Sequence, residues 1–337
     1  MDFVIPAWFE ITAMVVLVLI LAADLLIILK RPHIPSMKEA ALWVVFYVVL
    51  ALIFAVLLLS ATGSGDAAGQ FLAGWLTEYS LSIDNLFVFV LLMSQFSVPR
   101  RYQQEVLMVG IIIALVLRGL FILLGAALIE NFSWIFYIFG LFLVYTAWRQ
   151  AFPGKEEEDV QAETGIVRFL RRFVNISDRY EGSRLRTTVD GRKVWTPMVL
   201  VFLSIGVTDL IFAIDSIPAI FGITHHAFIV FAANIFALMG LRQLYFLLGG
   251  LLDRLRYLHY GIAFILAFIG AKLFAHALHV NEVPFINGGR PVDWAPEIST
   301  VASLVVIVAA MLVATGASLA ASRREKRAAI SAGDEPR

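Results

Sequence analysis

The fold of this chain is decided by two acidic segments, Thr77-Glu78-Tyr79-Ser80-Leu81-Ser82-Ile83-Asp84-Asn85 and Thr208-Asp209-Leu210-Ile211-Phe212-Ala213-Ile214-Asp215-Ser216. Each segment carries two carboxylates six residues apart, inside a run of apolar residues long enough to cross a membrane. An ionised Asp or Glu in hydrocarbon costs on the order of 3 kcal/mol even on lenient insertion scales. We therefore expect each of these acids to have a cationic partner or a functional role.

The composition is that of a membrane protein. The chain has 337 residues, of which 60% are hydrophobic and 15% charged, and its mean hydropathy is +0.85. These values predict an all-α, polytopic membrane protein. The sequence has no cysteine, which excludes disulfides and thiolate metal sites. The 26 basic residues equal the 26 acidic ones in number, so the net charge does not indicate a nucleic-acid partner, and we expect none.

Nine apolar stretches are each long enough to span a hydrocarbon core of about 30 Å. They lie near residues 7–29, 39–60, 71–97, 105–129, 132–151, 196–221, 226–250, 257–278 and 299–321. The chain therefore divides into helices one to five (1–151), a charged cytoplasmic linker (152–195), helices six to nine (196–321) and a charged tail (322–337) that we expect to be disordered.

Lys and Arg residues are concentrated in alternate connections between these stretches. Three follow the first stretch, two follow the third, ten lie in 149–195, two follow the seventh and five lie in the tail, whereas the other connections hold only Arg290. Basic loops face the cytoplasm. We therefore expect a bacterial-type inner membrane protein with its N-terminus outside and its C-terminus in the cytoplasm.

The two halves of the chain contain an internal repeat. Residues 117–125 (LRGLFILLG) match residues 241–249 (LRQLYFLLG) at six of nine positions, including an arginine. The first copy lies within 71–151 and the second within 196–278. Because each copy has three spans, the second must cross the membrane in the opposite sense. Inverted repeats of this kind build many secondary transporters and place the substrate site at the repeat interface.

The spacing of the acids limits what one ion can touch. Residues i and i+6 of a helix are about 120° apart in projection and about 9 Å apart along the axis. A single ion can reach both acids of a segment only if the helix is broken. Pro218 favours a break, because it cannot donate to the carbonyl of Ile214 and would leave that oxygen available. Without breaks, the acids mark successive positions along a path.

Carboxylate, carbonyl and amide oxygens suit Mg²⁺, Ca²⁺ or Mn²⁺. The four acids of the two segments, set against the charge-balancing residues Arg118, Arg242 and Lys272, leave a net charge of −1. A metal ion and a proton would then compete for the same carboxylates, which is the physical basis of exchange. A purely structural alternative is that the arginines pair with the acids to hold the bundle together.

Four histidines also gather at the predicted outer side. His225 and His226 follow span six, and His276 and His279 share a face of span eight. They are interpreted either as exposed loop histidines or as a proton relay at the exit.

Several motifs together resemble the TerC family, which is named for tellurite resistance and includes the Alx-type manganese exporters. They are residues 38–40 (KEA), 78–89 (EYSLSIDNLFVF), 117–125, 209–221 (DLIFAIDSIPAIF), 234–237 (NIFA), 240–242 (GLR) and 270–272 (GAK). The resemblance implies a divalent-cation exporter, with Mn²⁺ as the favoured ion and intramembrane acids as ligands. It carries over to Glu78, Asp84, Asp209 and Asp215. Family members often have Glu at the position of Gly206, so the ligand number or ion preference can differ here.

We therefore expect a secondary transporter, and not an enzyme, that exports Mn²⁺ or a related divalent ion, driven by proton antiport. Asn85, Ser216 and the Ile214 carbonyl would support the ligand shell. The partners would be the metal ion, protons and the lipid bilayer, with no permanently bound cofactor. The alternative is a non-transporting scaffold that organises a stress-response or protein-insertion complex through residues 152–195.

Overall fold

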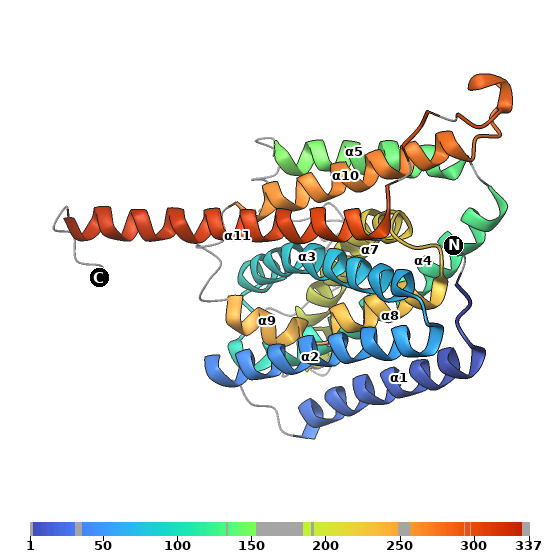
Figure 1. Cartoon of the computed structure of the whole chain (residues 1–337). Helices are drawn as coiled ribbons and strands as arrows, with labels where there is room; N and C mark the ends of the chain where they lie inside the picture. Colours follow the sequence, from blue (N-terminus) through green and yellow to red (C-terminus); the bar gives the residue numbers. More distant parts are fainter. Residues whose placement is uncertain are drawn as a thin grey trace.

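The chain forms a bundle of long helices, as the computed structural model shows (Figure 1). The structure describes residues 3–30, 36–132, 134–152, 185–189, 192–248, 257–292, 294–296 and 298–331. The helices are α1 (Ala7–Lys30), α2 (Met37–Thr62), α3 (Gly65–Gln95), α4 (Arg100–Asn131), α5 (Ile135–Ala151), α7 (Met198–Phe221), α8 (Ala227–Leu238), α9 (Leu241–Leu248), α10 (Leu258–His279) and α11 (Thr300–Ser331), with a 3₁₀ turn at Asn287–Gly289. The predicted all-α class is confirmed.

Seven helical spans among the described residues are long and apolar enough to cross a membrane. They correspond to α1, α2, α4, α7, α8 with α9, α10 and α11. The molecule is therefore a multi-pass membrane protein. The count of nine spans stays a prediction, because α3 and α5 are not among the seven.

Local sequence signals explain the ends of α2. Ser36 caps its start, accepting a hydrogen bond from the backbone N–H of Glu39 at 3.3 Å, and Ser-x-x-Glu is the sequence of a capping box. Gly63 ends the helix with φ = 64°, in the left-handed region that favours glycine, and its N–H bonds to the Leu59 carbonyl. The next helix starts two residues later, so α2 and α3 form a tight helical hairpin.

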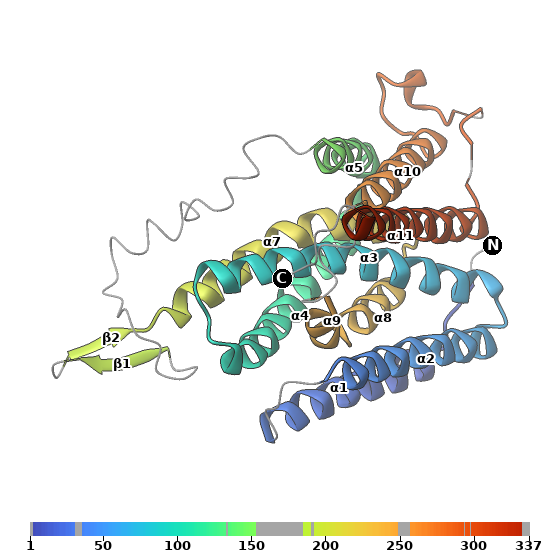
Figure 2. The same cartoon turned by 90° about the vertical axis from the view of Figure 1, so that its left-hand side faces the viewer.

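The packing of the helices pairs the two halves of the chain. α3 packs on α8 and α4 packs on α7, while α5 lies along α10. α3 and α7 run antiparallel, because Gln70 at the start of α3 accepts a hydrogen bond from Thr224, just beyond the end of α7, at 2.6 Å. Figure 2 shows the two helices crossing in opposite directions. An inverted repeat requires α3 and α7 to run in opposite directions, although the repeat itself stays a prediction.

The predicted helix break at Pro218 is wrong. α7 continues through Pro218 to Phe221, because the proline lies in the last turn, where its missing N–H removes only one hydrogen bond near the helix end. A different break, which was not predicted, lies in the following span at Met239–Gly240, where it separates α8 from α9. Gly240 adopts φ = +89°, a conformation that glycine adopts without a steric penalty.

Two further segments differ from the sequence-based prediction. The end of the predicted linker forms a hairpin of β1 (Arg186–Val189) and β2 (Arg192–Trp195), with Val189 paired to Arg192. Residues 153–184 of that linker lie outside the described part. The tail, expected to be disordered from residue 322, is helical as far as Ser331, and residues 332–337 lie outside the described part.

Two glycines let α5 and α10 touch at the backbone. A Cβ atom on Gly140 would lie 2.9 Å from the Gly270 carbonyl oxygen, and one on Gly270 would lie 2.8 Å from the Gly140 carbonyl oxygen. Small residues allow this close approach between membrane helices.

We expect Gly140→Ala to destabilise the protein by roughly 1–3 kcal/mol, because the added methyl forces the two helices apart. Thermal unfolding of purified protein, followed by tryptophan fluorescence, measures the change. Gly316→Ala in α11 is the matched control, because nothing lies within 4 Å of a Cβ atom there. Helix propensity alone then raises stability by up to about 1 kcal/mol. A Gly140→Ala protein as stable as the control would contradict the close contact.

Candidate functional site

A buried arginine lies at the centre of the candidate site. The Arg118 guanidinium pairs with the Glu78 carboxylate through Nη1 and lies 3.6 Å from Oδ1 of Asp209 through Nη2. Nη1 also donates to Oδ1 of Asn234 at 3.3 Å. All four residues are at most 2% exposed. We call Glu78, Arg118, Asp209 and Asn234 the Arg118 cluster.

Each residue of this cluster comes from a different helix. Glu78 is on α3, Arg118 on α4, Asp209 on α7 and Asn234 on α8. Glu78, Arg118 and Asp209 are each near the middle of a helix, far from either end. The cluster therefore lies deep in the bundle, away from the ends of the helices where water and lipid headgroups are found.

The face of α4 explains why Arg118 points inward. Positions 111, 114, 118, 122 and 125 are buried at helical spacing, whereas positions 112, 116, 120, 123 and 124 are exposed apolar residues. The exposed stripe is suited to lipid. Arg118 occupies the buried stripe, so its charge must be neutralised by other helices.

The acids keep oxygen atoms that the protein does not use. Oε2 of Glu78 and Oδ2 of Asp209 are buried without a hydrogen-bond partner among the described residues. The same holds for nearby hydroxyls on these two helices, those of Thr77, Ser80, Ser82, Ser204 and Ser216. Buried polar atoms usually have partners. A set of oxygens of this kind can coordinate a hard cation.

The other two predicted acids lie further along the same helices. Asp84 follows Glu78 by six residues on α3, and Asp215 follows Asp209 by six residues on α7. Each step is a rise of about 9 Å along the helix.

α3 and α7 are continuous between their acids. One ion therefore cannot touch both acids of a segment, and successive positions along a path are the arrangement that fits. The side chains of Asp84, Asn85, Asp215 and Arg242 lie outside the described part. Their predicted roles stay predictions.

One predicted residue lies elsewhere. The Lys272 ammonium donates to the Ser303 hydroxyl of α11 at 3.1 Å, and no contact joins it to the described Arg118 cluster. The prediction for Ile214 concerns its carbonyl, which lies within the continuous helix α7, and its role as a ligand stays a prediction. Ser216 is buried on α7.

The predicted metal site is not complete in the described side chains. No group of three or more His, Asp or Glu side chains is arranged to hold a metal ion among the described residues. Glu78 and Asp209 both contact Arg118, as the structural alternative requires. Two carboxylates and one guanidinium nevertheless leave a net charge of −1, so the pairing does not neutralise the cluster.

Sequence reasoning did not assign a role to two buried amides. Asn234 completes the Arg118 cluster, and Gln243, on α9 just after the helix break, is buried with neither side-chain polar atom hydrogen-bonded within the described part. Both are amides inside a strongly apolar run. The contrast between each amide and its apolar neighbours could have identified both residues, because a polar side chain in a membrane span needs a partner or a function.

A histidine group lies near the ends of α7 and α10. The rings of His225 and His276 are 5.2 Å apart, and His225 stacks on Phe136 at 5.1 Å, although His225 as a whole residue is exposed. The pKa of His225 is lowered to about 4, first by burial of the ring and then by the nearby cationic groups His276, Lys272 and His226. His225 is therefore neutral at physiological pH.

The chain is similar to several known membrane proteins. A family model described as integral membrane protein TerC family matches residues 63–326. An uncharacterized membrane protein of Mycobacterium tuberculosis H37Rv is 46% identical over 307 residues, which are 90% of this chain and 77% of the relative. The candidate membrane-bound redox modulator Alx is 42% identical in Salmonella typhi and 41% identical in Escherichia coli K12, each over 267 residues, 77% of this chain and 83% of the relative. No solved structure matches the chain.

We expect Arg118→Met to lower the free energy of unfolding by roughly 3–5 kcal/mol, because it leaves two buried carboxylates without their cation. Thermal unfolding of the purified protein measures the loss. Arg290→Met, at an exposed loop position, is the control and should change little. Adding Glu78→Gln and Asp209→Asn to Arg118→Met should restore part of the stability, and no recovery would contradict the pairing.

We expect the stability of the protein to fall as the pH is lowered from about 6.5 toward 4, partly through His225. The unfolded chain gains a proton on this histidine below its ordinary pKa of about 6.5, whereas the folded chain does so only near pH 4. The folded state therefore loses stability across this window. His225→Gln should lose less stability than the wild type in thermal unfolding at pH 7 and pH 5. Equal losses would contradict the lowered pKa.

Proposed function

Because this chain belongs to the TerC family of integral membrane proteins, we propose that it is a secondary transporter of a divalent cation, with Mn²⁺ as the preferred ion. The cation would pass the buried acids of α3 and α7. Transport would be outward and driven by inward protons. The protein would act as a transporter and not as an enzyme.

One observation carries this proposal, namely the unused carboxylate oxygens of Glu78 and Asp209. A structural ion pair would neutralise its charges and satisfy its oxygens. Here one arginine faces two acids, and one oxygen of each acid has no hydrogen-bond partner among the described residues. The charge deficit and the free lone pairs together favour the binding of an additional cation.

The chemistry of the donors favours a hard cation. Carboxylate, hydroxyl and amide oxygens surround the cluster, and the whole sequence lacks cysteine. Oxygen ligands suit Mn²⁺, Mg²⁺ and Ca²⁺ better than Cu⁺, which prefers sulfur. The family resemblance then favours Mn²⁺ among these ions.

Protons are the expected counter-ions. The carboxylates can bind either a metal ion or protons, and binding one displaces the other. Asp84 and Asp215, each about 9 Å along its helix from an acid of the Arg118 cluster, would let an ion move from one carboxylate to the next. The half-helices α8 and α9 supply the interrupted helix that many transporters use beside their substrate site.

The proposed direction follows from the distribution of basic residues. The segment 149–195 and the tail are the most basic connections, so they should face the cytoplasm of a bacterial-type inner membrane. The predicted histidine side would then be outside.

A scaffold is the second candidate. The ordered hairpin β1–β2, where Arg186 lies over the Trp195 ring at 4.0 Å, offers a folded element for docking. The Alx relatives are described as candidate redox modulators. A shared redox role would not rest on thiol exchange, because this chain has no cysteine. Deleting residues 155–182 should abolish a scaffold's function and leave transport largely intact.

We expect purified protein in liposomes to carry Mn²⁺, faster with an opposing pH gradient than without one. Glu78→Gln and Asp209→Asn should each lower the flux by at least about ten-fold. Mutating residues that only hydrogen-bond to metal ligands already lowers metal affinity or activity by about that factor. Asp66→Asn is the matched control, because Asp66 lies on the same helix as Glu78 but is exposed in its first turn. Flux that is unchanged in both site variants would contradict the proposed site.

We also expect Asp84→Asn and Asp215→Asn to abolish Mn²⁺ efflux while the protein still inserts into the membrane. Each change removes the charge of one acid that the proposed path uses. Intracellular manganese, measured by mass spectrometry in cells that express matched amounts of each variant, reports the loss. Normal efflux by both variants would rule out these two acids as part of the path.

A further inference from the structure

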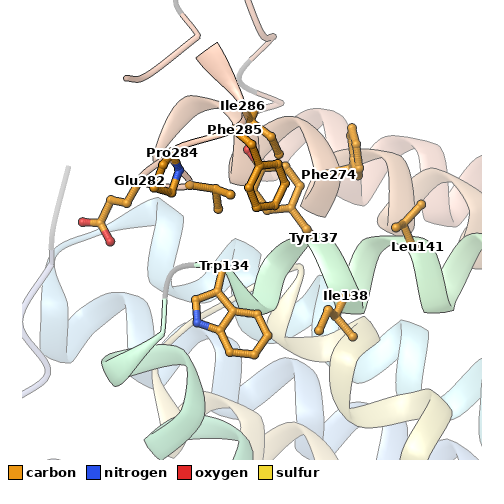
Figure 3. A pocket seen from close by; sticks show the side chains of 10 residues that line it. Trp134, Tyr137, Ile138, Leu141, Phe274, Glu282, Pro284, Phe285 and Ile286 are labelled. Atoms are coloured by element: carbon orange, nitrogen blue, oxygen red, sulfur yellow. The ribbon is translucent and has the colours of Figure 1, made fainter. Parts of the chain in front are cut away.

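An apolar pocket lies between the start of α5 and the loop after α10 (Figure 3). This loop is at the end of the bundle far from the hairpin β1–β2 (Figure 2). The volume of the pocket is about 730 Å³. Aromatic and aliphatic side chains of both segments line it, among them Trp134, Tyr137, Ile138, Phe274 and Phe285. It shares no residue with the Arg118 cluster.

The loop that forms one wall of the pocket is fixed by a buried asparagine. Asn281 is 2% exposed and its Nδ2 donates to the carbonyls of Ile286 at 2.6 Å and Arg290 at 3.1 Å. Its Oδ1 accepts from the backbone N–H of Val283 and from the Tyr137 hydroxyl, both at 3.0 Å. These bonds join the loop to α5, so the pocket exists before any ligand binds.

The interior of the pocket offers hydrocarbon contact and little polar recognition. Glu282 is the only charged residue among the ten that line it, and Figure 3 shows its carboxylate directed away from the rings of Tyr137 and Phe285. A polar or charged ligand would lose its hydration without gaining hydrogen bonds. The buried part of the occupant must therefore be apolar.

The pocket opens onto the surface of α5 that faces outward. Ile138 and Leu141 line the pocket and are 50% and 60% exposed. The stripe continues along the helix through Tyr145 and Trp148, with helical spacing. In a multi-pass membrane protein such an apolar face contacts lipid tails, and tryptophan is enriched near the headgroups, which suits Trp134 at this end of α5.

We propose that this pocket binds one acyl chain of a membrane phospholipid, which enters from the leaflet at this end of the bundle. The exposed apolar stripe of α5 leads directly to the pocket, so an acyl chain of the surrounding lipid reaches it without crossing a polar surface. The bound lipid would join the loop after α10 to α5.

The test uses a phosphatidylethanolamine that carries a photoreactive diazirine on one acyl chain, in liposomes with the full-length protein. After illumination, mass spectrometry locates the labelled residues. We expect label to concentrate on peptides that contain 134–141 and 282–286. Ile138→Trp, which fills the pocket, should lower that label by roughly ten-fold, as a loss of about 1.4 kcal/mol in binding would.

Leu120→Trp is the matched control, because Leu120 is 62% exposed on α4 and lies away from the pocket; its label at the pocket should equal that of the wild type. Val283→Phe fills the pocket from the loop side and replaces Ile138→Trp if that variant does not fold. Label at the pocket no stronger than on the exposed face of α4, or unaffected by both filling variants, would overturn the proposal. A second copy as the occupant would shield residues 134–141 and 282–286 from the lipid label, and that loss of label would also overturn the proposal.

Discussion

The Arg118 guanidinium needs counter-charges inside an apolar bundle, and this requirement organises the centre of the molecule. It is 1% exposed, so bulk water does not reach it, and an isolated charge at such a place is very costly. Glu78 from α3, Asp209 from α7 and Asn234 from α8 converge on it.

Arg118 alone does not balance the charge of the two acids or provide hydrogen bonds for all of their oxygens. Two carboxylates face one guanidinium, and one oxygen of each acid lacks a hydrogen-bond partner among the described residues. Replacing buried ion pairs with apolar residues is often neutral or stabilising. Apolar residues at these positions would therefore hold the helices together at least as well as the charged ones do. A binding site must hold its cation reversibly. Partial neutralisation by arginine weakens the attraction of the acids for a divalent ion, which permits release.

The sequence was most informative where charge conflicts with its surroundings. Glu78, Asp209 and Arg118 were recognisable because each is ionisable within a membrane-length apolar stretch, and the structure joins all three. Asn234 and Gln243 carry no charge and gave a weaker signal. The break predicted at Pro218 was wrong because the position of this proline near the end of α7 removes its effect. Gly240 was not singled out, although its conformation interrupts the helix.

Two local sequence patterns indicate elements that were not predicted, namely the β-hairpin and the last part of α11. Asp190-Gly191 after Thr187-Thr188-Val189 and before Val194-Trp195 is a hairpin signal, and β1 pairs with β2. Residues 322–331 are rich in Ala, Arg, Glu and Lys, which favour helix, so α11 extends into the predicted tail. The relation between α5, α10 and the loop after it depends on Gly140, Gly270 and Asn281, whose partners are distant in sequence and could not be paired from it.

The most direct test of the central claim is the binding of Mn²⁺ to purified protein, followed by electron paramagnetic resonance of the free ion during titration. We predict saturable binding that competes with protons and is weakened at least about ten-fold in the Glu78→Gln/Asp209→Asn double variant, with Asp66→Asn unchanged. Equal Mn²⁺ affinity in the wild type and the double variant would contradict the assignment of these acids as cation ligands.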